Sequence, residues 1–354
     1  MEEVQIKVEN ISYQCPSCGG NMTYDPVTES LHCSYCETTT KIEELKSTEE
    51  FDLSEGLSVS SNWNEGKSIF HCKYCGADNI KDSKDLSSQC PFCGSDSVIK
   101  LDELPGIKPH RVIPFKISKD EALKKFQMKL KKSFYAPKKL KKEYQETPLS
   151  GIYLPSWTFD SHAITDYRGV LGKYYTRTVG SGKDRRTVTE VRWFPIRGVK
   201  TFDFDDVLVT SGKTLTNDQM SNILPYNTND SLVYDEAYLA GYNAEHYTVS
   251  LEDGWDLSKN KTDDLMKQSI LSQYHYDVVR DYKQHSVYSN IKFKYVLLPV
   301  WKSHYKYRNK DFYFIVNGST GKVGGKMPVS FWKVSMTVLF VILIIALIVI
   351  LFNY

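Results

Sequence analysis

The sequence predicts an α+β, β-rich fold, in which two small N-terminal cysteine modules precede a large, mostly antiparallel β domain with a few helices and one C-terminal transmembrane helix. Three observations support this prediction. A pattern of paired cysteines occurs twice before residue 100, and residues 150–327 are dense in tyrosine, phenylalanine, valine and threonine. Residues 334–352 then run without a charged side chain. At 354 residues, the chain is long enough for several domains.

The cysteine modules are predicted at residues 10–43 and 68–100. Each has two Cys-x-x-Cys pairs separated by fourteen residues, and all eight cysteines of the chain belong to these pairs. Two such pairs can bind one metal tetrahedrally, as in a zinc ribbon. Because the chain opens without an export signal, we expect reduced, metal-bound thiolates rather than disulfides. The predicted ligands of two Zn²⁺ ions are Cys15, Cys18, Cys33, Cys36, Cys72, Cys75, Cys90 and Cys93.

Two other uses of these cysteines stay open, a rubredoxin-like iron site and a set of redox-active dithiols. A redox Cys-x-x-Cys usually stands alone beside a βαβ pattern, so four pairs matched in twos favour zinc ribbons. In CPSCGG and CPFCGS, Gly19 and Gly94 are expected to adopt the left-handed conformation that a knuckle requires. Four thiolates leave no open coordination position, so the ribbons predict structural rather than catalytic metal.

Charge divides the chain into an acidic head and a basic body. Residues 1–100 hold eight basic and 17 acidic side chains, whereas the whole chain has a net charge of +2. Two Zn–Cys₄ centres would make the head still more acidic, which disfavours contact with phosphate backbones. The segment at 44–67 is rich in serine, glutamate and glycine, and we predict a linker there between the two ribbons.

The β domain is predicted at residues 105–328, and it begins with a basic helix near 118–135. Ser118, followed three residues later by Glu121, has the pattern of a capping box, and apolar side chains then recur at helical spacing. A second helix is expected near 257–280. Long runs rich in β-branched and aromatic residues fill the rest of the domain and predict strands and hairpins.

Basic residues of this domain are candidate contacts for anionic lipid or for a partner. The basic helix carries lysines outside its apolar stripe, and a predicted hairpin turn at 179–186 has a basic tip. A solvated helix face is the simpler interpretation, but each lysine held near a bilayer would add about 1 kcal/mol of attraction to anionic lipid. The candidate contact residues are Lys124, Lys125, Lys129, Lys131, Lys132, Lys183, Arg185 and Arg186.

The β domain also contains an internal repeat. Residues 152–157 read IYLPSW and residues 296–301 read VLLPVW, so a Leu-Pro-x-Trp motif precedes alternating aromatic residues in both places. We expect each motif to be a strand whose proline lies at a sheet edge or bulge, because proline donates no backbone hydrogen bond. The repeat predicts one domain built from two related sheet units.

Residues 334–352 are predicted to form a transmembrane helix. They would span roughly 28 Å, close to the ~30 Å hydrocarbon core of a bilayer. Lys326 and Lys333 precede the segment, and no basic residue follows it. The positive-inside rule then places residues 1–333 in the cytoplasm, as expected for a single-pass protein of the cell membrane with a C-terminal tail anchor.

Motifs typical of catalysis are absent from the sequence. It contains no His-Glu-x-x-His, no Gly-x-Ser-x-Gly and no P-loop, and the glycine-rich runs at 179–186 and 317–325 lack the P-loop spacing. These runs are expected to be hairpin turns. An enzyme whose site is assembled from distant residues stays an alternative, as does a membrane-tethered protein that binds nucleic acid or the transcription machinery.

The cysteine knuckles, the two Leu-Pro-x-Trp units, the run NGSTGKVGGKMPVSFWK and the apolar C-terminal segment together resemble a bacterial family of membrane proteins with zinc ribbons of the transcription-factor-IIB type. The resemblance covers most of the chain, and the knuckles are its most specific motif. It implies a partner in a phage-shock-type membrane-stress system, namely a phage-shock protein A homologue. The expected function is therefore a non-enzymatic adaptor or scaffold that recruits cytoplasmic proteins to the membrane, and nucleic acid is not expected as a partner.

Overall fold

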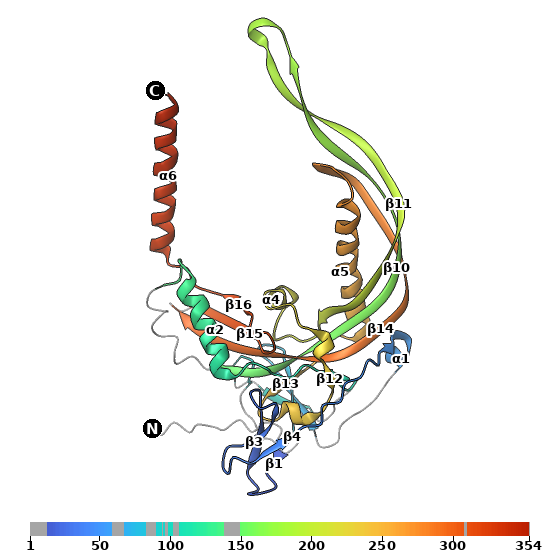
Figure 1. Cartoon of the computed structure of the whole chain (residues 1–354), viewed down its shortest axis with the longest axis vertical. Coiled ribbons are helices and arrows are strands. Elements are labelled where there is room, and N and C mark those ends of the chain that lie inside the picture. Colours follow the sequence, from blue (N-terminus) through green and yellow to red (C-terminus); the bar gives the residue numbers. More distant parts are fainter. Residues whose placement is uncertain are drawn as a thin grey trace.

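A computed structural model describes residues 13–58, 67–82, 90–93, 95, 98–101, 106–137, 149–307 and 310–353. It shows a β-rich α+β protein with two N-terminal cysteine clusters, a large, mainly antiparallel sheet and a C-terminal apolar helix (Figure 1). The predicted fold class is confirmed. Residues 10–12 of the first predicted ribbon and residues 59–66 of the predicted linker lie outside the described residues.

Three long strands dominate the large sheet: β10 (Ser150–Val179), β11 (Arg186–Thr210) and β14 (Val278–Tyr307). β10 lies between the other two and pairs antiparallel with both, so the three form a curved ribbon that rises from the body (Figure 1). Near its base, shorter strands complete a sheet of twelve strands. These are β5 (Phe51–Asp52), β6 (Lys67–Cys72), β7 (Asp78–Asp82), β8 (Val98–Leu101), β9 (Arg111–Val112), β12 (Leu232–Val233), β13 (Asn243–His246), β15 (Lys310–Asn317) and β16 (Val323–Lys326).

The two Leu-Pro-x-Trp motifs lie side by side at the base of the ribbon, where Leu154 faces Leu298. The prediction of a proline at an edge holds only locally, because each proline lies within the sheet but at a place where one side of its strand is unpaired. Pro155 falls between the stretches of β10 that pair with β13 and with β11, and Pro299 falls between the stretches of β14 that pair with β9 and with β15. The Pro155 carbonyl accepts from Ser211 N at 3.1 Å, so the proline nitrogen faces this gap, where no strand requires an N–H.

Three β-bulges bend the long strands into an arch. The register shifts beside Asp206 in β11 and beside Asp281 and Asn290 in β14, and these residues have φ values of 49°, 55° and 50°. A bulge adds one residue to one strand and increases the local bend and twist. Aspartate and asparagine tolerate the left-handed conformation better than other residues with a side chain. We call the part of the ribbon beyond Asp206 and Asn290 the arm, which comprises residues 161–179, 186–204 and 278–289.

Both predicted helices are present, but their ends differ from the predicted ones. α2 (Lys119–Lys132) begins at the predicted cap, where the Ser118 hydroxyl accepts a hydrogen bond from Glu121 N at 3.3 Å. The second helix, α5 (Leu251–Leu271), begins and ends earlier than the predicted 257–280, because Ser250 caps it. The other helices in the described parts of the chain are α1 (Leu53–Ser58), α4 (Asn217–Ser221) and α6 (Phe331–Asn353).

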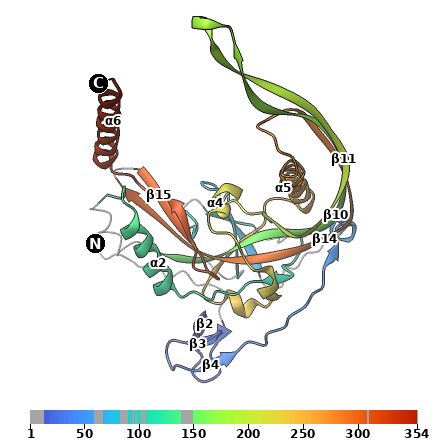
Figure 2. The same ribbon diagram turned by 45° about the horizontal axis from the view of Figure 1, so that its top comes forward.

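Only the inner face of the arm is covered, and α5 covers it (Figures 1 and 2). Tyr167 and Leu171 of β10 point inward and are buried in a small core with Ile270 and Leu271 of α5. Because side chains alternate along a strand, the residues between them point outward. Within the described residues, the outer face of the arm has no covering element, and it faces away from α6.

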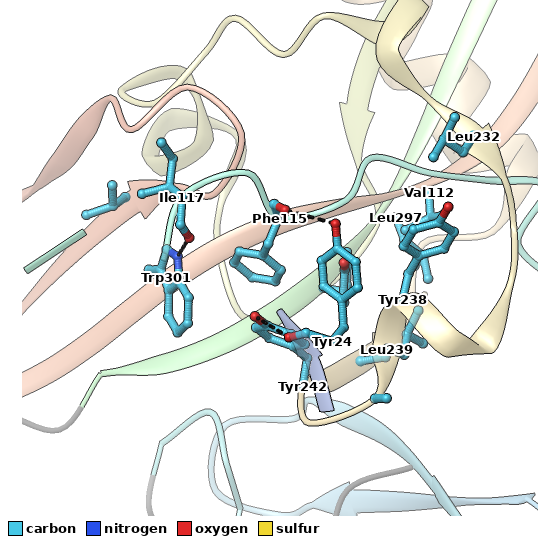
Figure 3. Close-up of a cluster of buried hydrophobic side chains, with 14 of the residues drawn as sticks. Tyr24, Val112, Phe115, Ile117, Leu232, Tyr238, Leu239, Tyr242, Leu297 and Trp301 are labelled. Carbon is cyan, nitrogen blue, oxygen red and sulfur yellow. Dashed lines mark hydrogen bonds between the residues drawn. The ribbon is translucent and has the colours of Figure 1, made fainter. Parts of the chain in front are cut away.

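The main core lies at the base of the sheet and contains both tryptophans of the repeated motif. Trp301 is buried and donates its indole N–H to Ile117 O at 2.8 Å (Figure 3). Trp157 is fully buried and donates to Val249 O at 3.0 Å. A buried indole with a satisfied N–H contributes a large apolar area without an unpaired donor. The motif therefore supplies two anchors of the core, one on each of the paired long strands.

A phenylalanine on α2 provides the first test of this packing. The Phe126 ring is buried and stacks on Phe314 of β15, with 3.6 Å between ring centroids. Phe126→Ala should lower the free energy of unfolding by about 3–5 kcal/mol, the usual cost of removing a buried phenylalanine. Met128 on the same helix is exposed, so Met128→Ala is the matched control. It should change the free energy of unfolding by less than about 0.5 kcal/mol. Chemical denaturation in detergent measures both, and equal effects would contradict the packing.

Candidate metal centres and apolar helix

The first cysteine cluster is built on a separate four-stranded sheet. Its strands are β1 (Tyr13–Gln14), β2 (Asn21–Asp25), β3 (Ser30–Cys33) and β4 (Thr39–Lys41). The Cys15 and Cys36 sulfurs lie 3.5 Å apart, as do those of Cys18 and Cys33. Tetrahedral Zn–S bonds of about 2.3 Å would place sulfurs about 3.8 Å apart, so the four free thiols fit one zinc ion.

Backbone hydrogen bonds shape the knuckles. Gly19 N donates to Cys15 O at 2.8 Å and closes the turn around the first pair. Gly19 and Gly76 both have a φ of 71°, and Glu37 takes the equivalent place in its knuckle with a φ of 59°. The left-handed conformation predicted for Gly19 is confirmed, whereas Gly94 lies outside the described residues. A non-glycine residue at this position is sterically disfavoured, so the Glu37 turn is held by its surroundings.

The second cysteine cluster belongs to the large sheet. The Cys72 and Cys93 sulfurs lie 3.7 Å apart and those of Cys75 and Cys90 lie 3.8 Å apart, so this cluster could also hold a zinc ion. Its β6 pairs with β7 and β8, β7 pairs with β13, and β13 pairs with β10. The cluster also packs into a core shared with β10, β14 and β15. Metal bound here would support the sheet itself.

The two clusters differ in their surroundings. Cys18 and Cys36 of the first cluster are exposed, whereas the second cluster has two buried and two half-buried cysteines. The Lys302 ammonium of β14 interacts electrostatically with three thiols of the second cluster and donates to Thr214 O at 3.3 Å. Burial lowers the pKa of Lys302, and its carboxylate neighbour Glu245 opposes that shift. A Zn–Cys₄ centre carries two negative charges, which a nearby cation offsets.

The first module is docked on the β domain through Tyr24 of β2 (Figure 3). This buried residue donates its N–H to Ala240 O at 2.9 Å and its hydroxyl to Phe115 O at 3.3 Å. Its ring packs edge-on against Tyr238, with 5.4 Å between centroids, and its carbonyl accepts from the Tyr242 hydroxyl at 3.4 Å. One residue, through its backbone and its side chain, therefore joins two sheets that are separate in their strand pairing.

The segment after the first module also lies against the β domain. We call residues 44–58 the strap, and they form the described part of the predicted linker. Arg111 of β9 donates to Ser47 Oγ at 2.8 Å and to Glu49 O at 2.9 Å. Further along, β5 of the strap pairs with β14. The serine- and glutamate-rich sequence does not predict these contacts, because polar side chains and backbone groups make most of them.

A half-buried charged cluster fastens the strap to the bulge at Asp206. Lys294 Nζ lies 2.7 Å from Asp206 Oδ1, 3.2 Å from Glu50 Oε1 and 4.0 Å from Asp160 Oδ2. Burial and the hydrogen bond with Glu50 raise the pKa of Asp160 to about 7, and the same bond lowers the pKa of Glu50 to about 2. Glu50, Asp160 and Asp205 bring carboxylates within 4.8 Å of one another, and Lys294 supplies positive charge beside them. The sequence shows the aspartates, but the bulge that turns Asp206 inward is visible only in the structure.

The C-terminal helix is long and apolar enough to span a membrane. The candidate span is Phe331–Leu351, slightly earlier than the predicted 334–352, and none of its residues is buried. At its start, Lys333 Nζ donates to Phe134 O at 2.7 Å and to Ala136 O at 2.9 Å. Phe134 and Trp332 are exposed there, and aromatic residues of this kind are typical of a membrane–water interface.

The predicted contact residues lie at two distant places, on α2 near the start of α6 and at the tip of the hairpin between β10 and β11 (Figure 1). α2 carries Lys124, Lys125, Lys129, Lys131 and Lys132, and the tip carries Lys183, Arg185 and Arg186. Lys125 forms an ion pair with Glu121 at 3.4 Å, and Lys129 donates to Val323 O. Part of the α2 lysine set therefore has structural contacts, and the two basic groups do not form one surface.

These features define a β-rich protein with two Cys₄ clusters compatible with zinc ribbons and one helix of membrane-spanning length. The chain is 32% identical over 327 residues to the uncharacterized protein YdjG of Bacillus subtilis (strain 168), and the match covers 92% of each chain. The chain therefore belongs to the same family as YdjG. No family model and no solved structure matches it.

Paired cysteine substitutions test the two centres. Cys15→Ser with Cys18→Ser should leave one zinc ion per chain and preserve the large sheet, because the first module has its own strands. Cys72→Ser with Cys75→Ser should also leave one zinc ion but should lower the unfolding temperature of the large sheet, since metal binding contributes folding energy directly. Mass-spectrometric metal analysis and circular dichroism measure the two effects. Two zinc ions per chain in either variant would contradict the ligand assignment.

Asp160 should make stability depend on pH. Its pKa is raised from 3.8 to about 7 on folding, so the folded state retains a proton that the unfolded state releases. Stability is therefore lost as pH rises from about 4 through about 7. In the Asp160→Asn variant, the side chain at position 160 cannot ionise. This variant should therefore be more stable than the wild type near pH 8 by about 1 kcal/mol, a value discounted for partial solvent access. The difference should vanish towards pH 4.

Thermal denaturation across this pH range measures the Asp160 effect. Asp166→Asn, which removes a carboxylate from the exposed outer face of the arm, is the matched control. Glu50, whose pKa is lowered on folding, loses its stabilising contribution as pH falls below about 4 in all three proteins. An Asp160→Asn advantage that is constant with pH would contradict the pKa assignment.

Proposed function

We propose that this protein is a non-enzymatic, membrane-anchored adaptor, in which two zinc ribbons and the β domain bind a protein while α6 holds the assembly at the cell membrane. The observation that carries the proposal is an exposed helix of membrane-spanning length joined to a body with two closed sets of four thiols. Closed tetrahedral zinc has no position for water or substrate, so the clusters support architecture rather than chemistry.

The base of α6 supports an orientation with the body in the cytoplasm. Lys326 and Lys333 lie before the apolar span, and lysines flanking a span favour the cytoplasmic side. The exposed lysines of α2, such as Lys124 and Lys132, are close to this base and would attract anionic lipid by about 1 kcal/mol each. Exposed aromatic side chains at the same level support an interfacial position.

The resemblance of the sequence to membrane proteins with ribbons of the transcription-factor-IIB type supports a phage-shock protein A homologue as the partner. The long arm adds a reason to expect a protein partner, because its outer face is exposed along its length. The competing function is binding of nucleic acid or of the transcription machinery. It would rely on the lysines of α2. The acidic head of the chain opposes it.

Three forms of the chain test the adaptor function in cells: the full chain, a chain ending at Val329, and a chain with α6 replaced by an unrelated apolar transmembrane helix. A protein partner should copurify with all three after nuclease treatment. It should fractionate with membranes only in cells with the first and third forms, because α6 acts as an anchor. A partner that stays at the membrane without α6 would contradict recruitment, and copurified material lost on nuclease treatment would favour the competing function.

A further inference from the structure

The outer face of the arm carries three cations in direct cross-strand register. Arg168 of β10 faces Arg197 of β11 on one side and Lys283 of β14 on the other. Side chains directly opposite in antiparallel strands have Cβ atoms about 5 Å apart, and like charges placed there destabilise a sheet. All three are exposed, and no ion pair joins any of them to another described residue. The row therefore costs stability in the free protein, which indicates that it serves binding.

The cation row borders a groove of about 670 Å³ at the bulge beside Asp281. Gly169, Val170 and Pro195 line the groove between the cations, so its floor is mainly apolar while its rim is positive. Asp281 also lines it, but this carboxylate pairs with Arg280 at 3.5 Å. The positive φ of Asp281 is typical of the bulges and conformational outliers that gather at functional sites.

Exposed aliphatic side chains continue the outer face from the groove towards the base of the arm. Ile164 of β10 faces Val287 of β14, and Val199 of β11 faces Asp166 of β10. Their exposed fractions are 48%, 60% and 68%, which are large values for aliphatic side chains on three adjacent strands. One part of the outer face is therefore rich in aliphatic side chains, with Asp166 and His285 at its border, and the adjoining part is positive.

We propose that this face binds an acidic amphipathic helix of a partner protein, with carboxylates on the cation row and an apolar stripe on Ile164, Val199 and Val287. Carboxylates one helical turn apart lie about 5–6 Å from one another, which matches the spacing of about 5 Å along the row. The inference rests on the proposed adaptor function and names the chemistry of its partner.

Peptide binding to the full-length, zinc-loaded protein in phosphatidylcholine nanodiscs tests the proposal. The probe is a short fluorescent helical peptide with glutamates one turn apart beside a leucine stripe, and its control has glutamine at each glutamate. R168Q/R197Q/K283Q should weaken binding of the acidic peptide about tenfold or more. The matched control K173Q/R177Q/R192Q removes three cations elsewhere on the same hairpin and should weaken binding of the acidic peptide less than about twofold.

Thermal unfolding separates a binding role from a structural one. R168Q/R197Q/K283Q should unfold a few degrees above the wild type, because the like-charge row is removed. A lower unfolding temperature would show that these cations stabilise the fold and would overturn the proposal. It would also be overturned by unchanged peptide affinity in that variant, or by equal affinity for the glutamine peptide.

Two further probes identify other occupants of the groove. The probes are phosphatidylglycerol vesicles and a short DNA duplex. If the binding of either probe depends on Arg168, Arg197 and Lys283 more strongly than the binding of the acidic peptide does, the face would be assigned to lipid or nucleic acid, against the proposal. Failure of the peptide-binding proposal can be distinguished from failure of the adaptor function, because the membrane-recruitment experiment varies α6 and leaves the arm intact.

Discussion

The antiparallel pairing of β10 with β14 is the constraint on which the rest of the structure depends. At the base, the Leu154–Leu298 pair sets a register that buries both motif tryptophans and leaves a gap in strand pairing beside each motif proline. On one side of the pair, β13 and β7 carry the second cysteine cluster, and on the other side β9 and β15 receive the strap and α2. In the opposite direction the same two strands continue into the arm.

The two metal centres are attached to this frame in different ways. The second lies on strands of the large sheet and shares its core, so its metal site and the sheet form one cooperative unit. The first has a sheet of its own and reaches the body through the buried contacts of Tyr24 and through the strap. Two identical cysteine spacings therefore serve unequal structural roles, because the neighbouring strands and not the ligands decide how each centre is coupled to the fold.

The features that sequence analysis recovered are those encoded within one short segment. Cysteine spacing brings four sulfurs together, a capping box starts α2, and an uncharged apolar run forms α6, since each depends on residues within about one or two turns or one hairpin. The predicted start of α5 was wrong because the helix begins earlier, where the Ser250 hydroxyl accepts a hydrogen bond from Asp253 N at 3.1 Å. Long-range features were beyond reach: Tyr24 looks like any strand tyrosine, and Arg168, Arg197 and Lys283 become neighbours only when the strand register is known.

The bulges at Asp206, Asp281 and Asn290 have a consequence for how this protein can vary. A strand that slips by one residue exchanges its two faces, and burial under α5 resists such slippage only where the helix covers the arm. Each bulge accommodates one surplus residue at one place, so the three together lock the alignment of the long strands. Insertions and deletions in the arm of related chains should therefore be confined to the hairpin tip.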